Sequence, residues 1–125
     1  MLSKHEIHAT IPTKDLARAR KFYEEKLGFQ PESVAPGGIV YRCKDSWFLL
    51  YPSAGAGTAQ HTVAGWTTDH IEKDVSGLRE RGVTFEEYDL PGFKTVEGIA
   101  TVPGSKAAWF KDTDGNILGI VQLDS

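Results

Sequence analysis

The stretch TKDLARARKFYEEKLGF, residues 13–29, has a counterpart later in the chain, TTDHIEKDVSGLRERGV, residues 67–83. In both, apolar residues recur every three or four positions, which is the spacing of a helix with one buried face. Thr13 is the predicted N-cap of the first helix, and a glycine ends each helix. The aspartates Asp15 and Asp69, and the two terminal glycines, are each 54 positions apart (69 − 15 and 82 − 28). The two stretches therefore predict equivalent helices of a repeated unit.

Strand-like segments surround each helix in the same order. Residues 5–12 alternate polar and apolar residues, as a half-buried strand does, with Ile7, Ala9 and Ile11 expected to face the helix. The further strand candidates are 29–34, 39–43 and 47–51 in the first half, and 61–66, 83–88, 106–111 and 116–122 in the second. The order β-α-β-β-β thus occurs twice. We predict one α+β domain over residues 1–125, divided into module 1 (1–52), a linker (53–60) and module 2 (61–125).

The stretch DLPGFKTVEGIATVPGS, residues 89–105, interrupts this symmetry. A loop of this length within a compact domain is usually a lid or a binding loop. A short extra strand with turns is the alternative interpretation. Near the C-terminus, DTDGN (residues 112–116) lacks the further acidic positions and the closing glutamate of an EF-hand loop. Asp114-Gly115 instead predicts a hairpin turn between the last two strands.

Composition excludes several classes of protein. The net charge is −3, from 14 basic and 17 acidic residues, and the one basic run, 18–21, is followed by Glu24 and Glu25. We therefore expect no nucleic-acid partner. No apolar run approaches the ~18 residues of a membrane span, and the N-terminus lacks the apolar core of a signal peptide. A soluble, cytoplasmic protein is expected. The single cysteine, Cys43, is interpreted as a buried, inert thiol.

The chain resembles a known superfamily in the order and spacing of short motifs. The matching residues are Asp15-Leu16, Phe22-Tyr23 and Leu27-Gly28-Phe29 in module 1, then Asp69, Ile71, Leu78, Gly82-Val83 and the closing WFKDTDGNIL in module 2. This pattern is similar to that of the vicinal oxygen chelate superfamily, which includes glyoxalase I, bleomycin-resistance proteins, fosfomycin-resistance enzymes and extradiol dioxygenases. The resemblance implies paired βαβββ modules forming a cup-shaped, incompletely closed mixed β-barrel around a small ligand, with the helices on the convex side. It also implies a homodimer.

The resemblance further implies where a metal would bind. Metal-dependent members place their ligands at cup-facing strand positions, and here those positions fall on His8, Leu49, Val63 and Gly119. Since a divalent metal needs three or four converging donors, we favour no metal cofactor. The alternative is a rearranged site for a divalent metal (Zn, Ni, Mn or Fe), built from His8, His61 and one carboxylate.

Strand alternation predicts which side chains would line the cup. They are His8, Thr10, Trp47, Leu49, Tyr51, His61, Val63, Gly65, Ile117 and Gly119. An apolar, aromatic wall with a few polar points is typical of a small-molecule pocket, although these aromatics could instead fill the core. Gly119 leaves room where metal-dependent relatives carry a glutamate, which favours a bulkier or flatter organic ligand. The faces of Trp66 and Trp109 stay unassigned.

Three hypotheses for function follow. The first is a metal-independent protein that binds a small aromatic or amphipathic molecule in the cup. The second is a divalent-metal-dependent lyase, isomerase or dioxygenase that uses His8 in a rearranged site. The third is a metal-free enzyme in which His8 or Tyr51 transfers a proton. Whether the chain is an enzyme is left open by the sequence.

Overall fold

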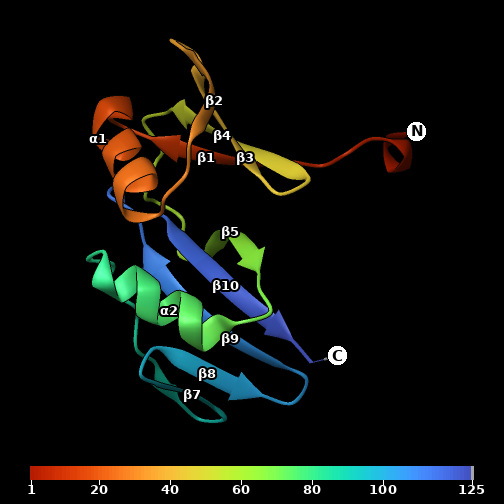
Figure 1. Cartoon of the computed structure of the whole chain (residues 1–125), viewed down its shortest axis with the longest axis vertical. Coiled ribbons are helices and arrows are strands. Elements are labelled where there is room, and N and C mark those ends of the chain that lie inside the picture. Colours follow the sequence, from red (N-terminus) through yellow and green to blue (C-terminus); the bar gives the residue numbers. More distant parts are fainter. Residues whose placement is uncertain (125) are drawn as a thin grey trace.

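The computed structural model describes residues 1–124, which form two open sheets with one longer helix against each (Figure 1). A short 3-10 turn, η1 (Leu2–Lys4), precedes them. The first sheet has the order β1 (Ala9–Thr13), β4 (Ser46–Pro52), β3 (Gly38–Cys43), β2 (Pro31–Ala35). The second has the order β5 (Thr62–Thr67), β10 (Ile117–Leu123), β9 (Ser105–Lys111), β8 (Ile99–Val102), β7 (Phe93–Val96), β6 (Asp89–Leu90). Ser125, the last residue of the predicted module 2, lies outside the described residues.

Both sheets are mixed in the same way. The first strand of each unit pairs in parallel with its last strand, β1 with β4 and β5 with β10, while the remaining pairs are antiparallel. The predicted α+β class is confirmed. Module 1 has the predicted βαβββ order, and module 2 keeps this pattern with two additional strands, so that five strands, β6 to β10, follow its helix within residues 81–124. In the described part of the chain, no helix is long and apolar enough to cross a membrane.

The first helix differs from the prediction at its start. Helix α1 (Leu16–Lys21) is capped by Asp15, whose carboxylate accepts the N–H of Arg18 at 3.1 Å, so Thr13 is not the N-cap. The reason is that Thr13 is the last residue of β1, and its hydroxyl instead accepts the N–H of Asp15. The helix continues as a π-helical turn, η2 (Phe22–Lys26). The wider π turn places the consecutive residues Phe22 and Tyr23 both in the core.

The second helix, α2 (Ile71–Glu80), has its first turn fixed by a strand of its own sheet. The side chain of Gln122, from β10, accepts the N–H of Ile71 at 2.8 Å, which satisfies one of the unpaired donors of the helix start. At the other end Gly82 has φ +92°, and the N–H of Val83 bonds to the carbonyl of Leu78 at 3.0 Å. This is the Schellman ending that the terminal glycine predicted.

One predicted strand, 83–88, is wrong, since it forms only a single bridge between Phe85 and Phe110. The reason is local: the Thr95 hydroxyl accepts the N–H of Tyr88 at 2.8 Å, so a side chain takes a donor that a strand partner would have used. The following segment, 89–105, forms β6, β7 and β8, which pair in sequence order with β9. The alternative of extra strand and turns is thus the one observed.

A single core continues from one sheet to the other. Trp66 of β5 provides the junction, because its ring centroid lies 5.7 Å from Phe29, 5.9 Å from Phe48 and 6.4 Å from Phe110. The first two belong to module 1 and the third to module 2. Ile7, expected to face the helix, is instead 93% exposed because it precedes β1 and has no layer above it.

The DTDGN turn between β9 and β10 connects both modules and the linker. The Tyr23 hydroxyl donates to the buried Asp112 carboxylate at 2.6 Å, and the Asn116 amide donates to the Pro12 carbonyl at 2.7 Å. The linker joins through the N–H of Gly57, which donates to Asn116 Oδ1 at 3.0 Å. The antiparallel pairing of β9 with β10 confirms the predicted hairpin turn. The Asp112 carboxylate of this turn makes hydrogen bonds within the chain, so its role is structural.

Candidate ligand-binding site

The first sheet presents its predicted cup residues on the face opposite the core. Phe48 and Leu50 are buried in the core, so Trp47, Leu49 and Tyr51 point to the other side, where they are half-buried. Thr10 on β1 lies directly opposite Leu49. We name this side of the two sheets the concave face. On module 1 it therefore carries the expected mixture of aromatic, aliphatic and hydroxyl groups.

His8 is held against Trp47 just before β1 begins. The two rings stack with centroids 3.7 Å apart and an interplanar angle of 20°. His8 Nδ1 lies 3.1 Å from the Trp47 carbonyl oxygen, and Nε2 lies 3.4 Å from a carboxylate oxygen of the exposed Glu6. A proton on Nδ1 would donate to that carbonyl and leave Nε2 as the acceptor. The ring is thus oriented, with one nitrogen able to contact a ligand if Glu6 moves aside.

On module 2 the backbone itself forms part of the concave face. Gly65 and Gly119 are paired neighbours, and a Cβ on Gly65 would lie 3.1 Å from the Gly119 carbonyl oxygen. Ile117 pairs with Thr62, but the register shifts before the next residue. After this irregularity Val63 packs against the core cluster. His61 is exposed and precedes β5.

Trp109 occupies the space that Gly119 was expected to leave open. A Cβ on Gly119 would lie 3.4 Å from both Cδ1 and Nε1 of the indole. Trp109 also contacts Phe93 and Tyr88, with centroids 5.3 and 5.7 Å away. The expectation of an empty position is corrected, because the residue opposite Gly119 on β9 covers it. Strand parity alone could have assigned Trp109, since it pairs directly with Gly119 across the predicted hairpin, whereas Tyr88 and Phe93 gave no such signal.

The two histidines of the alternative metal site lie at opposite ends of the junction between modules. β1 and β5 run in opposite directions (Figure 1). One cavity is lined both by Ala9, at the start of β1, and by Thr67, at the end of β5. His8 is therefore near the end of β5 while His61 precedes its start, a strand length of about 16 Å away. Among residues 1–124, no three His, Cys, Asp or Glu side chains gather in a way that could hold a metal.

The cavity at this junction, of about 530 Å³, lies between the modules, and Ala9, Cys43 and Trp66 line it from the core side of their strands. We name it the seam cavity; among the residues that line it are Ala9, Cys43, Trp47, Gly65 and Trp66. Burial raises the pKa of the Cys43 thiol, so the neutral, weakly nucleophilic form prevails at neutral pH. Lys44, Ser46 and Thr67 also line the cavity, so its wall mixes apolar and polar groups, and Trp47 joins it to the His8–Trp47 stack.

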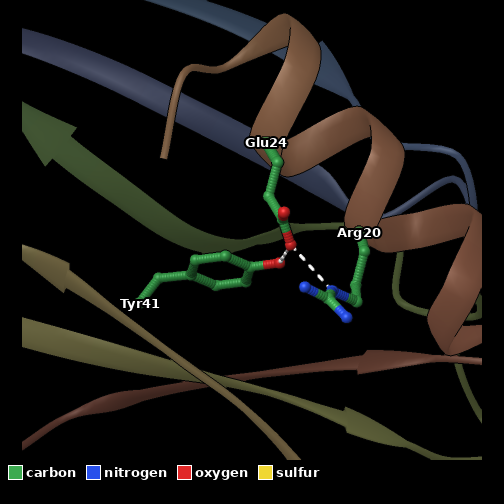
Figure 2. Close-up of polar contacts among 3 residues, drawn as sticks. All are labelled: Arg20, Glu24 and Tyr41. Carbon is green, nitrogen blue, oxygen red and sulfur yellow. Dashed lines mark hydrogen bonds and ion pairs between the residues drawn. The ribbon is translucent and has the colours of Figure 1, made fainter. Parts of the chain in front are cut away.

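The polar cluster shown in Figure 2 lies outside the concave face. Arg20 and Tyr41 both donate to the same oxygen of Glu24, each at 2.8 Å. Burial opposes ionisation of Glu24, but these two hydrogen bonds outweigh it and lower its pKa. Burial, followed by the hydrogen bond to Glu24, raises the pKa of Tyr41. The carboxylate is therefore ionised and the phenol neutral, which suits a clamp between η2 and β3.

These features define a class of protein: two βαβββ modules side by side, helices on one side and an apolar concave face on the other. A model of the Glyoxalase/Bleomycin resistance protein/Dioxygenase superfamily matches residues 7–120. The chain belongs to this superfamily. A search of curated proteins found no match.

Several solved structures share the fold over nearly the whole chain. TnmS3, an antibiotic binding protein from Streptomyces sp. CB03234, is 24% identical with a TM-score of 0.72, over 95% of this chain and 98% of that one. A glyoxalase/bleomycin resistance protein from the same strain is 25% identical with a TM-score of 0.67, over 91% and 98%. Lactoylglutathione lyase from Agrobacterium tumefaciens is 16% identical with a TM-score of 0.70, over 94% and 92%.

Proposed function

We propose that this protein binds a small aromatic or amphipathic organic molecule on its concave face, without a divalent metal. The observation that carries the proposal is the row of half-buried Trp47, Leu49 and Tyr51 side chains beside an oriented His8. Apolar surface with a few fixed polar groups is the usual composition of a small-molecule site. The antibiotic binding protein among the similar structures supports the same class of ligand.

Two observations favour binding without a metal. Trp109 covers Gly119, the position where metal-dependent relatives carry a glutamate. His8 is separated from His61 by the length of β5, so the two would need a donor from elsewhere to share one ion. The Trp109 ring therefore occupies one of the four positions where a chelate would be built.

The ligand is expected to stabilise the folded protein. A thermal-shift screen with aromatic metabolites and antibiotics should therefore give a raised melting temperature for a specific ligand, because ligand that binds only the folded state shifts the equilibrium. Leu49→Glu should abolish that shift. Val34→Glu, on the exposed outer strand β2 of the same sheet, is the matched control and should retain it. Equal shifts in both variants would place the ligand elsewhere.

Elemental analysis separates this function from the metal-dependent alternative. Protein purified without chelator should contain no stoichiometric zinc, nickel, manganese or iron. Stoichiometric metal that is lost in His8→Ala would overturn the proposal and favour a lyase, isomerase or dioxygenase. If a ligand is consumed without metal, the decisive variants are His8→Ala and Tyr51→Phe, since these hold the available proton-transfer groups.

We further propose that two copies form a homodimer, as the superfamily resemblance implies. The concave face leaves Trp47, Leu49 and Tyr51 partly accessible, and apolar surface of this kind marks ligand or protein contact sites. Sedimentation equilibrium should give twice the chain mass. A monomer at micromolar concentration would contradict the proposal and require one chain to hold the ligand alone.

A further inference from the structure

A second cavity, of about 470 Å³, lies on the helix side of the molecule. Phe29 from module 1 and Trp66 and Phe110 from module 2 form its aromatic floor. The Trp66 ring stacks with Phe29 at 5.7 Å and 26° and with Phe110 at 6.4 Å and 11°. We name this cavity the helix-side cleft. Because its walls come from both modules, it exists only in the assembled chain.

The rim of the helix-side cleft carries two cations. Lys73 is exposed on α2, and Arg81 follows the end of the same helix. Arg81 donates one Nη1–H to the Glu25 carbonyl at 3.1 Å, which holds the guanidinium at the rim while its fork offers further donors. The rim also contains Asp74, whose carboxylate accepts the Thr68 hydroxyl. With two cations and one carboxylate, the rim has a net charge of +1.

We propose that the helix-side cleft binds a small planar aromatic molecule carrying one anionic group, at a site separate from the concave face. The aromatic ring lies along the Trp66 floor, where offset stacking and apolar burial favour it. The anion lies between Lys73 and Arg81, which supply charge-assisted hydrogen bonds. The volume is within the range of small-molecule sites, and the net charge of the rim selects against cationic ligands.

Gly77 offers a way to block the cleft without damaging the core. It lines the cleft from α2, and a Cβ there would meet no atom within 4 Å. Gly77→Phe adds a ring at the mouth, and Gly77→Ala is the matched control. Both substitutions replace glycine within a helix, so the helix gains propensity in each. Arg81→Glu is the third variant, which reverses one charge of the rim.

The probe is 1-anilinonaphthalene-8-sulfonate, a planar aromatic sulfonate, titrated by its fluorescence. Wild type and Gly77→Ala should bind it equally, whereas Gly77→Phe and Arg81→Glu should each weaken binding by roughly tenfold, about 1.4 kcal/mol. No binding to the wild type, or unchanged affinity in Gly77→Phe, would overturn the proposal. Dye binding that is weakened in Leu49→Glu but not in Gly77→Phe or Arg81→Glu would also overturn the proposal, because it would place the dye on the concave face. A change of oligomeric state in Gly77→Phe with unaltered dye binding would identify the cleft as an interface between copies and also refute it.

Discussion

At the residue scale, the buried carboxylate of Asp112 is satisfied entirely by the chain. It accepts the Tyr23 hydroxyl, the N–H groups of Asp114 and Asn116 at 2.9 and 3.0 Å, and the Asn116 amide at 2.9 Å. Burial, followed by the charge of Asp112, raises the pKa of Tyr23, so the phenol stays a donor across the ordinary pH range. This pair fixes η2 to the turn that ends β9.

Tyr23→Phe should destabilise the protein by about 1.5–3 kcal/mol, because it removes a hydrogen bond to a buried charge. Urea denaturation followed by circular dichroism measures the change. Tyr88→Phe, at a half-buried ring, is the control and should stay within about 0.5 kcal/mol of wild type. Equal losses in both would show that the Asp112 contact contributes nothing specific.

Gly119 and Trp109 are coupled in a testable way. Gly119→Ala should be tolerated, since its Cβ would lie 3.4 Å from the indole, an ordinary contact. Gly119→Leu should displace Trp109 and redden its emission, because the larger side chain needs the volume that the ring fills. Fluorescence spectra in a Trp47→Phe, Trp66→Phe background isolate Trp109. An unchanged spectrum in Gly119→Leu would contradict the placement of the ring.

At the scale of elements, the linker is held by the hairpin turn. Gly57 has φ +77°, and a Cβ there would lie 1.9 Å from the Asp114 carbonyl oxygen, a distance no side chain can adopt. Gly57→Ala should therefore cost about 2 kcal/mol or more, from backbone strain and lost contact with the turn. Gly55→Ala, two residues earlier, would meet only Ser53 Oγ at 3.7 Å and is the matched control. Thermal unfolding of the two variants should separate them clearly.

The clamp between η2 and β3 predicts a pH effect. Glu24 has a pKa below its ordinary value of 4.5 in the folded state. Its contribution is therefore fully present above that value and is lost as the pH falls through the folded pKa. Wild type should lose stability from about pH 4.5 downward, and Glu24→Gln should show a shallower decline. Unfolding at several pH values, with the exposed Glu25→Gln as control, tests this; parallel curves for Glu24→Gln and wild type would contradict it.

At the scale of the whole molecule, the continuous core predicts that both modules unfold together. Trp66 contacts rings on both sides of the junction, so Trp66→Ala should cost about 2–4 kcal/mol and leave a cavity where the modules meet. Far-ultraviolet circular dichroism and tryptophan emission should give coincident transitions in wild type. Trp47→Ala, on the concave face, should cost less. Two separate transitions in wild type would show that the modules are independent.

Much of the fold was predictable from local patterns. Asp15 and Asp69 with their helical repeats indicated the two equivalent helices, and Asp114-Gly115 indicated the last hairpin. Alternation grouped Trp47, Leu49 and Tyr51 on one face of their strand, and all three are half-buried in the structure while Phe48 and Leu50 between them are buried. These properties depend on residues close together in the sequence, whose backbone preferences and burial act within one element.

Local periodicity of 3.6 or 2 residues was therefore enough to predict the two helices and the face of most strands, because it is a property of residues within one element. Which residues meet across the chain depended instead on the tertiary packing. The register shift beside Ile117 turned Val63 toward the core, Trp109 covered Gly119, and opposite strand directions separated His8 from His61. Such outcomes depend on the packing of elements distant in sequence, where side-chain volume and strand direction in three dimensions, rather than local propensity, select the arrangement.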